Sequence, residues 1–96
     1  MDLFGRVLWW SERDENGIIV DPLGNEFYFD RSVLKSSSKN KISRNKLVYF
    51  ELNNRIKDCL CACNVALAPA SKQKSLEKKY YQQARLSADM GVSSEQ

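Results

Sequence analysis

The chain has no histidine, only two prolines and four glycines, and no apolar run long enough to cross a bilayer. Histidine is the commonest general base and metal ligand, so its absence removes the simplest enzymatic and metal-binding arrangements. The most apolar stretch, residues 59–70, has twelve residues and includes Asn64 and Pro69, whereas a membrane span needs about 20. Residues 1–5 include an acid where a signal peptide needs basic residues. We therefore expect a cytoplasmic protein that is not an enzyme and has no membrane partner.

Cysteine occurs three times, with a spacing of two residues. An odd number this close together is not typical of a secreted disulfide framework. On a β-strand, residues two apart share a face, so we interpret Cys59, Cys61 and Cys63 as small buried hydrophobic residues. A redox or metal role is the alternative, although no histidine or fourth cysteine is present to complete a tetrahedral zinc shell. We predict no metal and no cofactor.

The overall composition is that of one folded domain, with 96 residues of which 43% are apolar and 28% are charged. Asn16-Gly17 predicts a type I′ hairpin turn, and residues 21–24 (Asp-Pro-Leu-Gly) predict a type I turn. Runs of β-branched and aromatic residues between such turn signals predict strands at residues 5–11, 18–20, 26–30, 46–52 and 59–67.

Five short strands in a flat sheet would leave two open edges, and closure into a barrel removes them. The size and strand count predict a mainly β fold, a five-stranded antiparallel OB-type barrel over residues 1–68. On the fourth strand, Val48, Phe50 and Leu52 share the face expected to be buried. The odd-numbered positions of the fifth strand are expected to be buried in the same way.

Residues 69–96 are predicted to be a helical extension, because helix-forming residues dominate from Ser71 onward. Leu76, Tyr80 and Ala84 recur every four residues and form one stripe of a helix over about residues 72–90, which Gly91 is expected to end. An isolated helix of this length is marginally stable, so the stripe needs a surface to pack on.

Several motifs within residues 4–67 resemble those of the bacterial cold-shock domain: Gly5-x-Val7-x-Trp9-Trp10-Ser11, Gly17-x-Ile19, Phe27-Tyr28-Phe29-x-x-Ser32-x-Leu34, Val48-x-Phe50-Glu51 and Ala62-Cys63-Asn64-Val65. The resemblance extends over all five predicted strands and agrees with an OB-type barrel. It implies a module that binds single-stranded RNA or DNA with low sequence specificity, such as an RNA chaperone or regulator. In that family, bases stack on exposed aromatic side chains beside basic residues that contact the phosphates.

The resemblance assigns base stacking to Trp9 and Tyr28, with Ile18 at an outward position beside them. Other binding positions of the family differ here. Leu8 occupies the position where the family has a lysine in its first strand. Further binding positions of the family are occupied here by Asp14, Asn16, Ile18 and Asp30. These replacements weaken the expectation of nucleic-acid binding, whereas the core positions match the family: Val7, Ile19, Phe27, Phe29, Val48, Phe50 and Val65.

Positive charge is concentrated in residues 31–46, which contain six basic residues and no acid. The remaining 80 residues hold nine basic and twelve acidic side chains, although the whole chain has a net charge of +3. Charge separation of this kind can attract a polyanion. The alternative is a solvated surface loop without a ligand. The residues predicted to hold phosphates are Arg31, Lys35, Lys39 and Lys41.

Two functions follow from these patterns. In the first, Trp9, Ile18 and Tyr28 form a surface that binds single-stranded RNA or DNA. In the second, the barrel has lost nucleic-acid binding, and either these residues or the Leu76/Tyr80/Ala84 stripe bind a protein partner or a second copy of the chain. Acidic replacements such as Asp14 and Asp30 would then disfavour nucleic acid.

Overall fold

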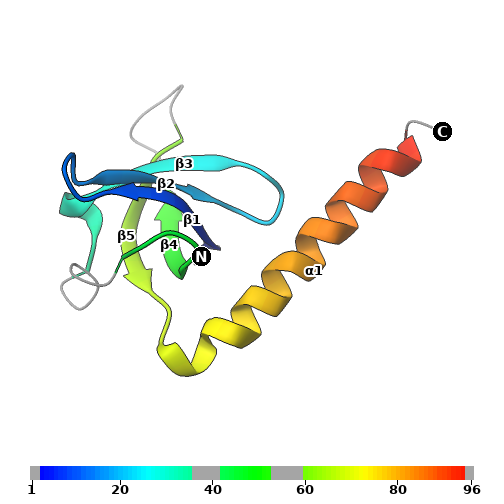
Figure 1. Ribbon diagram of the computed structural model, residues 1–96. Helices are drawn as coiled ribbons and strands as arrows, with labels where there is room; N and C mark the ends of the chain where they lie inside the picture. The colour runs from blue at the N-terminus through cyan, green and yellow to red at the C-terminus, as the bar shows by residue number, and fades with distance from the viewer. Residues whose placement is uncertain (1–2, 36–41, 53–59, 95–96) are drawn as a thin grey trace.

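The computed structural model describes residues 3–35, 42–52 and 60–94, with side chains as far as residue 86. Five antiparallel strands form one sheet in the order β3-β2-β1-β4-β5, which curls into a half-barrel and is followed by a single long helix (Figure 1). This confirms the prediction of a mainly β fold with five antiparallel strands and a C-terminal helix. The elements are β1 (Leu3–Ser11), β2 (Asn16–Val20), β3 (Glu26–Asp30), the 3-10 helix η1 (Arg31–Val33), β4 (Leu47–Leu52), β5 (Ala62–Leu67) and α1 (Ala70–Ser94).

The curl of the sheet brings the outer strands β3 and β5 together. The backbone N–H of Tyr28 donates to the carbonyl oxygen of Leu60 at 2.9 Å, and Tyr28 forms a parallel bridge with Cys61. A second parallel bridge joins Leu34, just after η1, to Val65. The two edges of the sheet, at β3 and β5, are therefore in contact at two points.

The core lies inside this curled sheet. All seven positions that were matched to a family core are buried, which confirms that part of the prediction. The rings of Phe27 and Phe50 have centroids 4.9 Å apart, and the ring of Trp10 stacks on that of Phe29 at 5.3 Å. The buried positions are Val7, Ile19, Phe27, Phe29, Val48, Phe50 and Val65.

The first hairpin differs from the prediction. Its turn is formed by residues 12–15, with a positive φ of 57° at Glu15, whose N–H donates to the carbonyl oxygen of Ser11. Asn16 and Gly17 instead lie inside β2, so the type I′ turn predicted there is wrong. Gly17 is required for packing, because a Cβ at this position would lie 2.4 Å from the carbonyl oxygen of Trp9.

The second hairpin turn, at residues 21–24, is confirmed. The N–H of Gly24 donates to the carbonyl oxygen of Asp21 at 3.0 Å, and Gly24 has a φ of 93°. One carboxylate oxygen of Asp21 also accepts from the N–H groups of Leu23 and Asn25. These bonds satisfy the backbone of the loop without any other element.

The strands β4 and β5 depart from simple alternation. Leu52 is exposed at the end of β4 and does not share the buried face of Val48 and Phe50. The register of β4 and β5 shifts in the middle, and Asn64 has a positive φ of 51°. Cys61 is buried as predicted, whereas Cys63 is only half-buried, so the prediction of one buried thiol face is wrong at Cys63. Cys59 lies outside the described residues.

The helix α1 has 25 residues and packs on the half-barrel through its N-terminal half. The side-chain amide of Gln73 bonds to both the N–H and the carbonyl oxygen of Leu47, at 3.0 Å each, and to the carbonyl oxygen of Ala68. Tyr80 is only 4% exposed. The rest of α1 extends away from the sheet (Figure 1) and continues through Gly91, so the expected stop there is wrong. An interior glycine costs only about 1 kcal/mol and need not end a helix.

Within the part of the chain that the structure describes, no helix has the length and apolar character needed to span a bilayer.

Candidate nucleic-acid interface

Three of the predicted binding residues form one row across the outer face of β1, β2 and β3. Trp9 pairs with Ile18, and Ile18 pairs with Tyr28. Trp9 is 42% exposed and Tyr28 is 39% exposed, whereas Ile18 is half-buried between them. Since neighbouring strands lie about 4.8 Å apart, the two aromatic residues are anchored roughly 10 Å from each other. We call Trp9, Ile18 and Tyr28 the outer row.

A β-bulge places Trp9 in this row. Val7 pairs with Ile19 and Trp9 pairs with Ile18, so Leu8 is an extra residue in β1. Without the bulge, Val7 and Trp9 would point to the same side, because side chains alternate along a strand. The bulge leaves Val7 in the core and turns Trp9 outward. Trp10 then points inward and stacks on Phe29.

Arg31, one of the predicted phosphate-binding residues, is held by two acids of the first hairpin loop. Its guanidinium lies 3.2 Å from a carboxylate oxygen of Glu12 and 3.3 Å from one of Glu15. It also lies 5.8 Å from the centroid of the Trp10 ring. An exposed ion pair contributes only about 0–1 kcal/mol, so a phosphate would compete with weak but existing partners.

The other predicted cations are only partly described. Lys35 is exposed, and its backbone N–H donates to the carbonyl oxygen of Val65, which places it where η1 meets β5. Lys39 and Lys41 lie outside the described residues. Ile18 and Tyr28 of the outer row are thus on β2 and β3, whereas Lys35 lies beyond β3.

Two further cations flank the opposite edge of the outer row. Arg44 and Lys46 are exposed in the turn before β4, and Asn45 in this turn donates its N–H to the carbonyl oxygen of Val7 at 2.8 Å. This bond places the turn beside β1, next to the bulge that carries Trp9. The sequence showed both residues as part of a basic segment, but it gave no sign that the segment folds back along β1.

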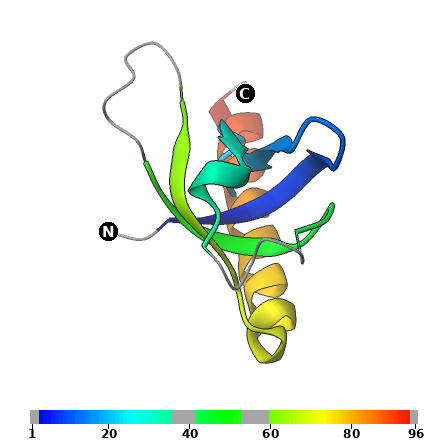
Figure 2. The same ribbon diagram turned by 90° about the vertical axis from the view of Figure 1, so that its left-hand side faces the viewer.

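The helix does not cover the outer row. The buried ring of Tyr80 packs near Arg6, whose guanidinium lies 5.8 Å from the ring centroid, and its hydroxyl donates to the carbonyl oxygen of Asp21 at 3.3 Å. Arg6 pairs with Val20, which precedes the Trp9–Ile18 pair on the sheet. In Figure 2, α1 lies behind the sheet and η1 lies in front of it. The part of the sheet that packs against α1 and the outer row are therefore separate surfaces.

The predicted stripe on α1 is used within the chain. Tyr80 is buried, and Leu76 and Ala84 are half-buried on the same side of the helix. Burial raises the pKa of the Tyr80 phenol, and the neighbouring Arg6 only partly offsets this effect. Tyr81 contacts Tyr80 edge to face, at 5.1 Å between ring centroids, but is itself 49% exposed.

Comparison of the chain with protein-family models gave no match, and comparison with curated proteins gave none either.

Proposed function

We propose that the protein binds single-stranded RNA or DNA across the outer face of β1, β2 and β3, and that its half-barrel is a divergent barrel of the OB and cold-shock type. The strand arrangement supports the fold assignment. A meander of three strands is joined to β4 and β5, and parallel bridges connect the first and last parts of the sheet. OB-type barrels bind oligonucleotides on the face formed around their second and third strands.

The observation that carries the proposal is the exposure of two aromatic rings in the outer row. Trp9 and Tyr28 project from the same face at the same level of the sheet, with Ile18 between them. A cluster of exposed apolar side chains, unlike a single one, is typical of a contact surface. Each base stacked on such a ring contributes about 1–3 kcal/mol and requires no particular base sequence.

Exposed cations on both sides of the outer row would meet the phosphates. Lys35 lies beyond β3, and Arg44 and Lys46 lie beside β1. For single strands, the logarithm of the binding constant falls linearly with the logarithm of the salt concentration, by about 0.7 for each phosphate contact. Two or three contacts therefore predict a loss of about 7- to 18-fold between 50 and 200 mM salt.

The test is the affinity of the protein for a labelled 15-nucleotide single strand of mixed sequence, measured by fluorescence anisotropy. Trp9→Ala is expected to weaken binding by about 5-fold or more, since it removes one stacking surface. Tyr81→Ala is the matched control, because Tyr81 is comparably exposed but lies on α1. Equal affinities of the two variants would contradict the assignment of Trp9.

A protein-interaction module is the second candidate, and one observation favours it. The cation nearest the outer row on the β3 side, Arg31, is paired with Glu12 and Glu15, and the centre of the row is the apolar Ile18. Such a surface also suits an apolar protein contact. Absence of oligonucleotide binding at both salt concentrations, together with a dimeric mass by light scattering, would favour this function.

A further inference from the structure

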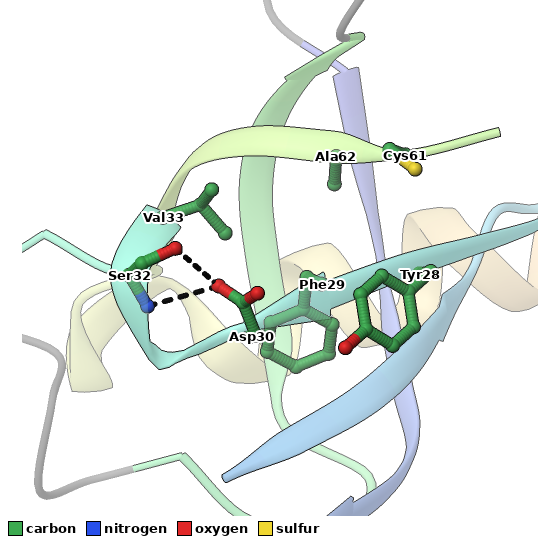
Figure 3. A pocket seen from close by; sticks show the side chains of 7 residues that line it. All are labelled: Tyr28, Phe29, Asp30, Ser32, Val33, Cys61 and Ala62. Carbon is green, nitrogen blue, oxygen red and sulfur yellow. Dashed lines mark hydrogen bonds between the residues drawn. The ribbon is translucent and has the colours of Figure 1, made fainter. Parts of the chain in front are cut away.

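A pocket of about 220 Å³ lies next to the outer row, between β3 and β5 (Figure 3). The two segments are joined on either side of it. Tyr28 bonds to Leu60 at one end, and Lys35 bonds to Val65 at the other. Between these points, Ser32 and Val33 of η1 line the pocket together with residues of β3 and with Cys61 and Ala62. The volume is below the usual 300–1,000 Å³ of small-molecule pockets, so it suits a single planar ring system.

The walls of the pocket are mostly apolar, and one carboxylate projects into it. Ala62 at the start of β5 and Cys61 just before it are buried, and Val33 of η1 is half-buried. Tyr28, a member of the outer row, forms the wall nearest to the stacking surface. The charged group of the lining is Asp30, at the end of β3, and Ser32 of η1 lies beside it. A nucleic-acid strand that crosses from β1 to β3 along the outer row would reach this pocket next.

The carboxylate of Asp30 is fixed in orientation by η1. Its Oδ1 accepts hydrogen bonds from the backbone N–H of Ser32, at 2.9 Å, and from the Ser32 hydroxyl. Both of these bonds fall on the same oxygen, and in Figure 3 the other oxygen lies on the side of Tyr28. A group that is already held in place loses little further freedom when it binds a ligand.

We propose that this pocket takes one nucleobase that bears an exocyclic amino group, and that Asp30 accepts a hydrogen bond from that group. The inference rests on the proposed function and adds a base preference to it. An ionised carboxylate is an acceptor only. It can pair with the amino group of cytosine, adenine or guanine, whereas uracil has no amino group, and its one base-edge donor, N3–H, lies between two carbonyl oxygens that a carboxylate repels. The apolar walls strengthen both effects, because they exclude water.

The test compares ten-nucleotide oligo-C and oligo-U RNA by fluorescence anisotropy at pH 7.5 and 50 mM salt. These bases have the same ring and differ in the amino or carbonyl group that Asp30 would contact. Oligo-C is expected to bind about 5-fold more tightly or better. Asp30→Asn offers a donor as well as an acceptor and can still cap η1, so it is expected to reduce the preference to less than about 2-fold.

Asp14→Asn is the matched control. It changes the charge by the same amount, but Asp14 lies in the first hairpin loop and bonds to Ser11. This variant is expected to retain the preference for oligo-C. Val33→Phe, which fills the pocket with an apolar ring, is expected to abolish the preference in the same way as Asp30→Asn. It keeps the test decisive if Asp30→Asn does not fold.

The outcomes separate the two proposals. Equal binding of oligo-C and oligo-U by the unmodified protein, or a preference that persists in Asp30→Asn and Val33→Phe, would overturn the pocket assignment and leave the proposed function standing. No binding of either oligonucleotide would overturn the proposed function and the pocket assignment together.

Discussion

Tyr80 is expected to be the main anchor of α1 on the half-barrel, and Tyr80→Ala tests this. The side chain is 4% exposed, and a tyrosine buries about 150–250 Å² of surface. At about 25 cal/mol per Å², the loss would be about 4–6 kcal/mol. Allowing for residual burial in the unfolded chain lowers the expected loss to about 3–4 kcal/mol.

Tyr81→Ala is the matched control, because it removes the same chemical group from the adjacent position. Tyr81 is 49% exposed and its described ring contact is with Tyr80, in an edge-to-face arrangement. An aromatic pair of this kind contributes about 0.5–1.5 kcal/mol. We therefore expect Tyr81→Ala to cost about 1 kcal/mol, well below the loss at Tyr80.

Urea unfolding followed by two signals distinguishes the helix from the sheet. Circular dichroism at 222 nm reports mainly on α1, whereas both tryptophans lie in β1. Tyr80→Ala is expected to shift the dichroism midpoint more than the fluorescence midpoint, because α1 is marginally stable once released. Equal losses for Tyr80→Ala and Tyr81→Ala would refute the argument that burial of Tyr80 anchors the helix.

Two further predictions concern packing and pH. Gly17→Ala is expected to lower the free energy of unfolding by about 1–3 kcal/mol, because the new Cβ would lie 2.4 Å from the carbonyl oxygen of Trp9; an unchanged thermal midpoint would contradict this. The folded state raises the pKa of Tyr80 above its ordinary value of 10.0, so its contribution to stability is complete below pH 10 and is lost as the pH rises further. Tyr80→Phe should therefore lose less stability than the unmodified protein between pH 9 and 11, and an equal loss would exclude this source.

The core could be predicted from the sequence because it depends on local alternation. Val7, Ile19 and Phe27 are predicted from strand patterns and lie side by side in the structure, in register across β1, β2 and β3. The Asp21–Gly24 turn was predictable for a related reason, since its bonds form within a few residues. Both features are set by neighbours along the chain, where residue type and position determine the outcome directly.

The first hairpin shows where local signals are ambiguous. Asn16-Gly17 is a strong turn signal, yet the turn is formed by residues 12–15, and the missing side chain of Gly17 allows β1 and the Phe29 ring to approach closely. A glycine that allows positive φ and a glycine that allows close packing look the same in a sequence. The bulge at Leu8 is similarly hidden, because the alternation of β1 alone would place Trp9 beside Val7.

The basic residues of the site could be counted from the sequence, but the acidic residues with which they form ion pairs could not be predicted. The sequence showed an excess of basic residues in the segment that begins with Arg31, but it did not show that Glu12 and Glu15 reach back to this side chain. The ion pair with Glu12 joins residues 19 positions apart. Such a pairing depends on the register of β2 with β3, which the composition of the segment does not specify.

The ion pairs of Arg31 determine which forces can support binding at the outer row. Two exposed pairs together contribute at most about 2 kcal/mol, so a phosphate that displaces Glu12 and Glu15 gains little beyond what it breaks. Bases stacked on Trp9 and Tyr28 would together contribute about 2–6 kcal/mol, with no such competition. The affinity of the proposed site should therefore depend on its aromatic rings more than on Arg31, and the basic residues at its edges should determine mainly how the affinity changes with salt.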